Sequence, residues 1–429
     1  MTAEIAILNK SGIALAADSA VTIGDQKVYN SANKLFALSK YQPVGIMVYD
    51  SADFMGIPWE LIIKEYRHQL GTKTFATLDQ YVEDFWTYLS ADEYIIPQTS
   101  KDDYFEALVH MLFGALYESL ETLVKARIES GSTVTIASTL PLFRDALDGT
   151  GEIVNSADYL PGFNEQDVVE LAITQRSKIL EMTFERFGEL SPLLSSDDQD
   201  EICRQAAALV VKDKFLLRAS GVVIAGFGDK DMFPKIASYL VEGMVDGRIK
   251  KAFILGKSTI HQDEFLTTIV PFAQDEMVWT FLAGVDPDIS SFAGTYLEGV
   301  FDQYASSLDS ESTGLQNGEL ERLRDRMQSD GAKLLEKFRE DLYQFQQKNN
   351  TQPILDMVGV LPKDELAAMA ESLVNLTVFK RKISRAVETV GGPIDVAVIS
   401  KGDGFIWIKR KHYFKPEYNP QFFANYYRE

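Results

Sequence analysis

Thr2, Asp18 and Lys34 are the residues of this chain whose types and spacing could do chemistry. Thr2 follows Met1 directly, and an initiator methionine that precedes a small residue is commonly removed. Removal would expose a threonine whose own α-amine can serve as the base for its hydroxyl. Because an α-amino group has a pKa of about 7.7–8.0, a substantial neutral fraction is present at neutral pH. The start of the chain therefore indicates a candidate N-terminal nucleophile.

A predicted β-hairpin brings a carboxylate to this nucleophile. Apolar stretches at residues 3–8 and 13–17 flank a polar turn at residues 9–12, which is typical of a hairpin. With either a two-residue or a four-residue loop, paired residue numbers sum to 21, so Asp18 lies opposite Ala3. The hairpin therefore places a carboxylate beside the first residues of the first strand.

Lys34 is the candidate for a link between Asp18 and the Thr2 hydroxyl, since it begins a further strand-like stretch. Its ammonium would lower the pKa of the hydroxyl and keep the α-amine neutral, and Asp18 would hold the lysine in place. We therefore expect a catalytic set of Thr2, Asp18 and Lys34.

The composition excludes several classes of protein. The chain has 429 residues, 46% of them hydrophobic, with 63 acidic and 42 basic side chains and a formal net charge of −21. This is typical of a globular protein rather than a disordered or fibrous one. Scattered Lys and Arg argue against a nucleic-acid partner, because phosphate backbones are bound by clustered cations. The densest basic run, 409–411, is expected to be a solvated strand end.

The sequence also predicts where the protein works. The single Cys203 forms no internal disulfide and suits a reducing compartment. No uninterrupted apolar run approaches the roughly 20 residues of a membrane span, and the start lacks a basic leader. We therefore expect a cytoplasmic protein without a membrane partner.

Other catalytic and ligand-binding motifs have little support. The four histidines are far apart and form no HExxH pattern, and no phosphate-binding glycine loop or GxSxG motif is present. Acidic groups at 228–231 and 286–288 lack the ligand spacing of a calcium loop and fit turns. We expect neither a metal nor a cofactor.

Apolar patterns divide the chain into strand-rich and helix-rich parts. A helix is predicted from Pro58 to Tyr66, and amphipathic helices dominate residues 72–215, among them 105–126 and 167–187. Later helices are predicted near 265–282, at 318–348 with an apolar stripe, and from 362 to about 383. The further predicted strands are 27–29, 34–38, 44–48, 220–227, 251–255, 394–399 and 405–408.

With these residues in place, the sequence resembles the proteasome β-subunit family of N-terminal-nucleophile hydrolases, which includes bacterial proteasome-like peptidases. The resemblance rests on Thr2, on Ile13-Ala14-Leu15-Ala16-Ala17-Asp18-Ser19 and on Asn33-Lys34-Leu35-Phe36. The family's aspartate and lysine follow its threonine by 16 and 32 residues, as Asp18 and Lys34 follow Thr2. The stretches 223–227 and 391–399 also look like family core strands.

The resemblance implies a fold and a domain organisation. The implied fold is a mixed α/β (α+β) four-layer αββα sandwich with large helical insertions. A discontinuous core of residues 1–71, 216–296 and 361–412 would be interrupted by helical insertions at 72–215 and 297–360 and followed by a tail at 413–429.

The resemblance also implies a threonine-type peptidase that acts on peptide or protein substrates within a self-assembled homo-oligomer. Any ATPase or unfoldase would be a separate chain. Two other functions stay open: a catalytically inactive scaffold or interaction protein, and an amidase that acts on a small molecule.

The sequence departs from the family pattern at two places. Residues 47–51 read Met-Val-Tyr-Asp-Ser where the family commonly has a glycine-rich turn that supplies an oxyanion-binding N–H. The family's Ser and Asp that position the terminal amine have no clean counterpart in 272–275 or 387–391. These differences concern the efficiency of catalysis more than the fold.

Overall fold

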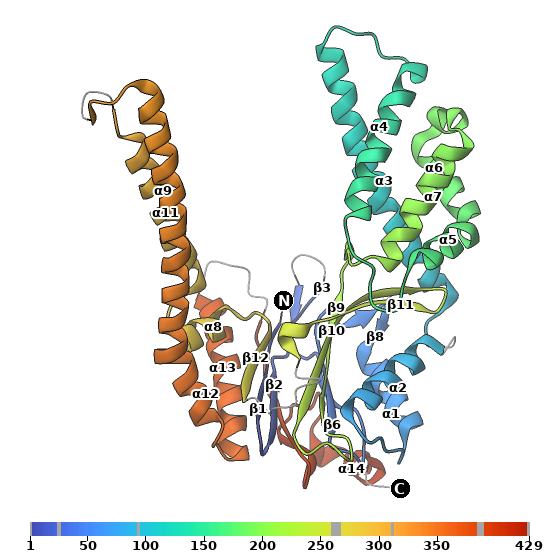
Figure 1. The fold of residues 1–429 in the computed structure, drawn as a ribbon. Coiled ribbons are helices and arrows are strands. Elements are labelled where there is room, and N and C mark those ends of the chain that lie inside the picture. Colours follow the sequence, from blue (N-terminus) through green and yellow to red (C-terminus); the bar gives the residue numbers. More distant parts are fainter. Residues whose placement is uncertain are drawn as a thin grey trace. The chain divides into compact units, whose positions relative to one another are not determined.

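The computed structural model describes residues 2–23, 27–91, 95–258, 267–309, 313–383 and 390–426 (Figure 1). It is 57% helical and 18% strand, and its sheets are antiparallel, so the predicted mixed α and β class is confirmed. Contacts group the chain into two compact units. The first holds Met1–Leu35, Asp231–Pro234 and His261–Glu429, and the second holds Phe36–Lys230 and Lys235–Ile260. The expected core and insertions stay a prediction.

The first unit contains a five-stranded sheet in the order β12-β1-β2-β13-β14. The predicted hairpin is confirmed with a two-residue turn, and Leu8 pairs with Ile13 and Ala6 with Leu15. The strands are β1 (Ala3–Asn9), β2 (Gly12–Ala17), β12 (Thr268–Ala273), β13 (Asp395–Ser400) and β14 (Gly404–Lys409), and a separate ribbon pairs β3 (Val21–Ile23) with β4 (Lys27–Tyr29).

Helices cover one face of this sheet. Alternate residues of β1, Ala3, Ile5 and Ile7, pack in a core with Leu366 and Ala370 of α13 (Lys363–Ile383), which lies against β1 and β2. The same core includes residues of α8 (Glu276–Ala283) and α12 (Gln352–Val358). The remaining helical segments of this unit are α9 (Pro287–Ser306), α11 (Asn317–Gln346), η3 (Gln347–Thr351), η4 (Pro416–Tyr418) and α14 (Pro420–Tyr426).

The second unit contains another five-stranded sheet, in the order β11-β10-β9-β6-β5. Val44, Ile46 and Val48 alternate along β6 and pack with Trp59 and Ile63 of α1. Its elements are β5 (Leu35–Ala37), β6 (Val44–Asp50), β9 (Ser220–Gly226), β10 (Lys235–Val245) and β11 (Arg248–Phe253), with the short pair β7 (Asp53–Phe54) and β8 (Ile57–Pro58), the helices α1 (Trp59–Leu70) and α2 (Leu78–Ala91), and η2 (Leu255–Lys257).

A helical cluster with its own apolar core completes the second unit. One of its members, α7, begins with a capping box in which Ser195 and Asp198 exchange hydrogen bonds, and Arg144 binds both carboxylate oxygens of Asp198. The cluster consists of α3 (Gln98–Glu129), α4 (Ile136–Asn155), α5 (Glu165–Thr174), α6 (Arg176–Phe187), η1 (Gly188–Leu193) and α7 (Ser196–Val211).

Within the described residues, α3 is the one helix with the length and hydropathy of a membrane span. One such helix is weak evidence for a span, because core helices of soluble proteins pass the same test. In α3, Phe105, Leu108, Leu112 and Phe113 are buried in the helical core.

Several sequence expectations about elements were wrong. The helix predicted near 265–282 is β12 followed by α8, while Phe265 itself lies outside the described residues. Pro271 argues against a strand, because proline is rare inside sheets. It is tolerated in β12 because β12 lies at the edge of its sheet. The helix expected over 167–187 is two helices, α5 and α6, with Gln175 between them. The strand predicted at 394–399, by contrast, is present as β13, which begins at Asp395.

The sequence analysis missed β10, the longest strand of the second sheet. Glu242 and Gly243 interrupt its apolar pattern at a β-bulge between Val241 and Gly243. Glu242 is buried there and pairs with Lys250 of β11 at 2.7 Å, so a charge in this strand is compensated by the neighbouring strand.

Candidate active site

Asp18 and Lys34 form a buried ion pair in the first unit. Lys34 Nζ donates to Asp18 Oδ1 over 2.5 Å, and both side chains are almost completely inaccessible to solvent. Asp18 directly follows β2, and Lys34 directly precedes β5. The structure therefore brings together two of the three residues that the sequence analysis selected.

Backbone N–H groups hold the Asp18 carboxylate from several sides. Ala3 donates to Oδ1 over 3.2 Å, and Ala20 and Gly391 donate to Oδ2 over 3.3 and 2.8 Å. The Asp18 N–H in turn donates to the Ala3 carbonyl over 3.1 Å, which extends the predicted hairpin register by one pair. With four donors, the carboxylate is fixed in orientation, and it fixes Lys34 in turn.

The loop that leads into β13 forms part of this site. Ser19 N–H donates to the Gly391 carbonyl over 3.0 Å, and the Ser19 hydroxyl donates to the Pro393 carbonyl. Gly392 has a φ of 77°, and a Cβ there would lie 2.7 Å from Cβ of Asn30. A glycine is therefore required at this position both by the backbone conformation and by the close approach of the loop containing Asn30.

Thr2 directly precedes Ala3, the residue that exchanges hydrogen bonds with Asp18. Thr2 is 4% exposed, and its Oγ1 has no hydrogen-bond partner among the described residues. Its carbonyl accepts a 3.1 Å hydrogen bond from Gln274 N–H. A buried hydroxyl without a partner is costly to a fold, and a chemical role is one of the reasons for which proteins keep such a group.

Met1, whose removal the nucleophile requires, lies outside the described residues. While Met1 is attached, the Thr2 nitrogen is an amide and has no basic lone pair. The hydroxyl gains its intrinsic base only when the peptide bond between the two residues is cleaved.

Residues that the sequence analysis did not select also hold the site. Gly391 and Gly392 were included only in the family-like stretch 391–399, although a Gly-Gly-Pro sequence is a turn signal that could have found this loop. Ala273 has a φ of 59°, a conformation that alanine rarely adopts, and it directly precedes Gln274, which binds the Thr2 carbonyl. No sequence signal marked Ala273.

Two other regions named in the sequence analysis stay untested as parts of this site. Residues 47–51 belong to the second unit, where β6 continues to Asp50. Residues 384–389, which include most of the stretch compared with the family's Ser and Asp, lie outside the described residues.

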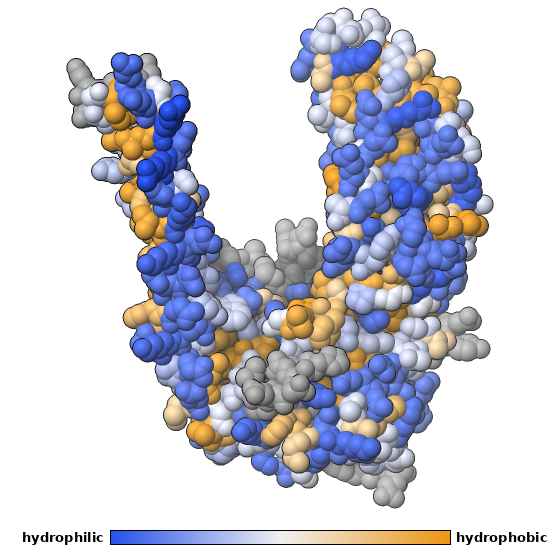
Figure 2. Space-filling view, viewed as in Figure 1, coloured by the Kyte–Doolittle hydropathy of each residue, from blue (hydrophilic) through white to orange (hydrophobic). Residues whose placement is uncertain are grey.

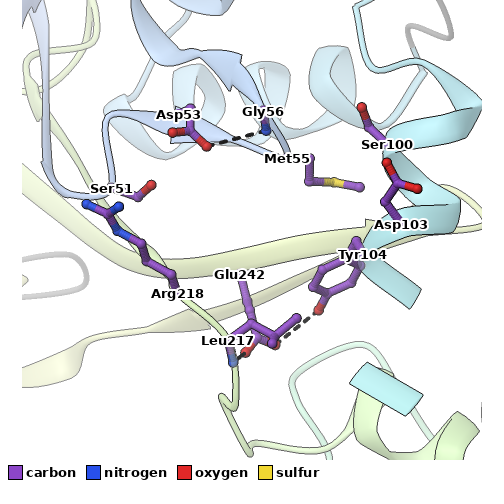
Figure 3. Close-up of a pocket in the computed structure, with 10 residues that line it drawn as sticks. All are labelled: Ser51, Asp53, Met55, Gly56, Ser100, Asp103, Tyr104, Leu217, Arg218 and Glu242. Atoms are coloured by element: carbon purple, nitrogen blue, oxygen red, sulfur yellow. Dashed lines mark hydrogen bonds between the residues drawn. The ribbon is translucent and has the colours of Figure 1, made fainter. Parts of the chain in front are cut away.

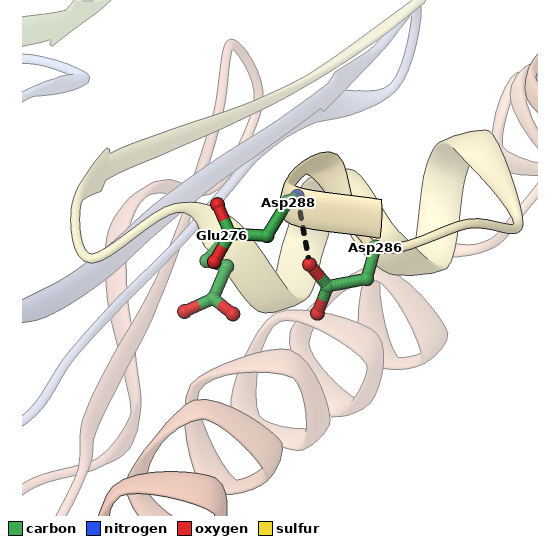
Figure 4. Close-up of side chains that lie close together, drawn as sticks. All are labelled: Glu276, Asp286 and Asp288. Carbon is green, nitrogen blue, oxygen red and sulfur yellow. Dashed lines mark hydrogen bonds between the residues drawn. The ribbon is translucent and has the colours of Figure 1, made fainter. Parts of the chain in front are cut away.

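An acidic cluster of Glu276, Asp286 and Asp288 has the spacing of a cation site (Figure 4). Lys380 donates to both Glu276 and Asp286, and Asp286 caps α9 by accepting from Asp288 N–H. These contacts account for Glu276 and Asp286, so the cluster does not indicate a metal centre.

The second unit contains a polar cavity of about 450 Å³ (Figure 3). Glu242 at its wall accepts from Tyr104, Leu216, Leu217 and Lys250. Burial, with the nearby Glu242 charge, raises the pKa of Tyr104 well above its usual value, and burial lowers the pKa of Lys250. Because these polar groups satisfy one another, Glu242, Tyr104 and Lys250 form a structural network rather than a reactive group.

Comparisons with known proteins add little. No protein-family model matches the sequence, and no curated protein matches it. The chain is similar to a solved structure described as Anbu (ancestral beta-subunit) from Yersinia bercovieri, at 10% identity and a TM-score of 0.24 over 99% of this chain and 93% of that chain. A TM-score this low carries no inference about fold, site or activity.

Proposed function

We propose that the protein is a threonine-type peptidase whose nucleophile is Thr2 after removal of Met1. The observation that carries this proposal is the buried Asp18–Lys34 pair, which is anchored to Ala3, the residue that follows Thr2. The Thr2 hydroxyl is itself buried and has no partner among the described residues. The spacing of Thr2, Asp18 and Lys34, which resembles that of N-terminal-nucleophile hydrolases, supports the same function.

The reaction needs no cofactor in this proposal. Thr2 Oγ1 attacks the amide carbonyl of a substrate, and the α-amine accepts the proton that the hydroxyl loses. Collapse of the tetrahedral intermediate releases the amine half of the substrate with that proton and leaves an ester on Thr2. Water, activated by the same α-amine, then hydrolyses the ester and regenerates the hydroxyl.

The ion pair has an electrostatic role in the proposed reaction. Placed beside Thr2, as the proposal requires, the Lys34 ammonium would favour the deprotonated hydroxyl and the neutral amine, because each change adds negative charge or removes positive charge beside a cation. Asp18 keeps Lys34 in place and is not itself consumed. Both groups are buried, so the field acts through a weakly screening medium.

The wider proposal follows the same resemblance. The fold would be the four-layer αββα sandwich with helical insertions that the resemblance implies. The peptidase would act on peptide or protein substrates in the cytoplasm as a homo-oligomer, with any ATPase or unfoldase supplied by a separate chain.

Intact mass spectrometry tests the nucleophile. We would incubate the purified protein with a peptide epoxyketone, an electrophile that forms a ring with both the hydroxyl and the free α-amine of an N-terminal threonine. We expect loss of Met1 and one adduct that localises to Thr2. Thr2→Ala and Lys34→Ala should abolish the adduct, Thr2→Ser should retain it, and Lys10→Ala, a change of an exposed lysine in the hairpin turn, should leave it unchanged.

Other outcomes favour the alternatives. A retained Met1, or a free Thr2 that never reacts, would contradict the peptidase and leave an inactive scaffold. Reaction with small amide electrophiles but not with peptide ones would favour a small-molecule amidase.

A further inference from the structure

The wall of the polar cavity in the second unit carries charged groups that its buried network does not use. Arg218, Asp53 and Asp103 line the cavity and are exposed to solvent. Within the described residues none of the three has an ion-pair partner, whereas Glu242 in the same wall pairs with Lys250. One cation and two anions therefore line a space of about 450 Å³, which is within the range of small-molecule sites.

Arg218 and Ser51 form an end of the cavity that suits an anion. The Arg218 guanidinium donates to the carbonyl of Asp50 over 3.2 Å, which places it close to Ser51, the next residue in the chain, and leaves its other N–H groups available. Ser51 is only 5% exposed, yet no described residue shares a hydrogen bond with its hydroxyl. A buried hydroxyl without a partner costs free energy. A carboxylate at this end would accept from the guanidinium and from the hydroxyl together.

The β7–β8 hairpin supplies the first of the two carboxylates. Asp53 follows Ser51 by two residues, and its Oδ1 accepts from Gly56 N–H over 3.3 Å, which leaves Oδ2 for a ligand. Met55 and Gly56 form the turn of this hairpin, with φ of 53° and 81°. Methionine is unfavourable at such a position, where Asn, Asp or Gly is usual, and its side chain lines the cavity. The hairpin therefore presents an acid and an apolar side chain to the same space.

The start of α3 supplies the second carboxylate. Asp103 follows Ser100 by three residues in this helix, so both side chains project from one face. Figure 3 shows Ser100 and Asp103 on the opposite side of the cavity from Arg218, with Met55 between the two sides. The cavity thus has an anion-binding end and, across an apolar middle, a cation-binding end.

These charges define the class of the ligand. An amino acid carries its carboxylate and its α-ammonium on one carbon, which matches Arg218 and Asp53, both near Ser51 in the chain. A cationic side chain would extend past Met55 to Asp103. A diamine would leave Arg218 without an anion, and an acidic amino acid would place like charges together at Asp103. A net charge of −21, and the many hydrophilic residues that Figure 2 shows on the second unit, also favour a polar, cationic ligand.

We propose that this cavity binds a free basic amino acid, lysine or arginine. Its α-carboxylate binds Arg218 and Ser51, and its α-ammonium binds Asp53. Its side-chain cation binds Asp103 and Ser100. Binding involves no step at Thr2, so this site goes beyond the proposed peptidase, and Thr2→Ala should bind the ligand as the unmodified protein does.

Isothermal titration calorimetry with L-lysine and L-arginine tests the site. We expect saturable binding to the unmodified protein, and Arg218→Met and Asp103→Asn should each weaken it about 10-fold or more, because each removes a charged hydrogen-bond partner. Arg127→Met and Asp145→Asn are the matched controls. They change exposed charges elsewhere in the helical cluster and should leave the affinity unchanged.

Lysine analogues test the two ends of the site separately. Cadaverine lacks the carboxylate of lysine, and norleucine lacks its side-chain amine. Each should bind about 10-fold or more weakly than lysine, because one end of the cavity then stays unpaired. L-glutamate should bind at least as weakly as norleucine.

Nuclear magnetic resonance of methionine methyl groups places the ligand in the unmodified protein. Lysine should shift the Met55 signal, which Met55→Leu identifies, because this side chain lines the cavity. The signal of Met232, a 73% exposed residue of the first unit, should stay in place.

Four results would overturn the proposal. The first is an absence of binding of either amino acid up to about 10 mM, beyond the millimolar range of weak ligands. The second is unchanged affinity in the folded Arg218→Met and Asp103→Asn variants. The third is binding that leaves the Met55 signal in place, which would put the ligand elsewhere. The fourth is glutamate binding as tight as that of lysine, which would exclude the assigned class of ligand.

Discussion

The backbone N–H of Gly391 donates a 2.8 Å hydrogen bond to Oδ2 of Asp18, although 373 residues separate the two in the chain. The candidate site is therefore not a property of the N-terminal hairpin alone. It requires the loop that leads into β13, and changes in that loop should affect both stability and reactivity.

Removal of the Asp18 charge should be strongly destabilising. Asp18→Asn leaves the Lys34 ammonium buried without a counter-charge, and we expect the free energy of unfolding to fall by about 3–5 kcal/mol. The double variant Asp18→Asn with Lys34→Met should recover most of this loss, since it removes both charges, but it should not react with the epoxyketone. Urea denaturation of the single and double variants measures the difference. Equal stability of the two would contradict a buried, mutually dependent pair.

A methyl group at Gly392 should displace the loop. Gly392 and Gly404 have nearly the same φ, 77° and 79°, but a Cβ at Gly404 meets no atom within 4 Å. Gly404→Ala should therefore cost only the backbone term, about 1–2 kcal/mol. Gly392→Ala should lower the free energy of unfolding by a further amount of about 1–3 kcal/mol, because the added methyl group clashes with Asn30.

Hydrogen exchange gives a local check on the Gly392 substitution. The Ala3 amide, which is bound to Asp18, should exchange faster in Gly392→Ala than in Gly404→Ala. The same exchange rate in both variants would mean that the loop does not support the site.

The second unit offers a pH-dependent test. The Arg144 guanidinium, with the Ser195 cap, holds the pKa of Asp198 at about 2, below the roughly 3.9 of an unfolded Asp. A lowered folded-state pKa stabilises the fold above about pH 4, and this contribution disappears as the pH falls through 4 toward 2.

Asp198→Asn should accordingly lower the free energy of unfolding by about 1–2 kcal/mol at pH 7. The expected loss is this small because Arg144 is half-exposed, so that solvent screens its attraction to Asp198. Near pH 2 the variant and the unmodified protein should be similar. Asp197→Asn, at the exposed neighbouring position, is the matched control and should show a smaller, less pH-dependent change. Thermal denaturation at several pH values would measure this, and a constant difference would refute the assignment.

An N-terminal extension that cannot be removed should abolish reactivity without loss of stability. The extension keeps the Thr2 nitrogen as an amide, so the hydroxyl lacks its base. In the processed protein, the rate of adduct formation should increase with pH as the α-amine loses its proton. The midpoint of this increase should lie at about pH 8, the usual pKa of an α-amine, or below it if the Lys34 charge lowers the pKa of the amine. The measurements are adduct formation against pH and urea denaturation of both forms. A reactive extended protein would contradict the role of the amine.

The parts of the fold that the sequence predicted are those set by local patterns. The hairpin register follows from the apolar stretches around a polar turn, and it placed Asp18 beside Ala3 as the hydrogen bonds now show. Lys34 was selected by its spacing, and its pairing with Asp18 agrees with that choice. Thr2 as a nucleophile stays a prediction.

The parts that the sequence did not predict depend on distant contacts. Pro271 is compatible with a strand only because β12 is an edge strand, and Glu242 is compatible with β10 only because Lys250 lies beside it. Gly391 acquires its role from a partner 373 residues away, which no local window contains. Ala273 has a φ of 59°, which no local sequence signal indicates.

The separation of Asp18 and Gly391 in the sequence also determines how long after Asp18 its partner Gly391 is synthesised. At about 5–20 residues per second, a ribosome needs about 20–75 s to add the 373 residues that separate them. During that interval the first residues have left the ribosome, yet their carboxylate lacks one of its four donors. The complete set of donors to Asp18 therefore forms only after Gly391 has been synthesised.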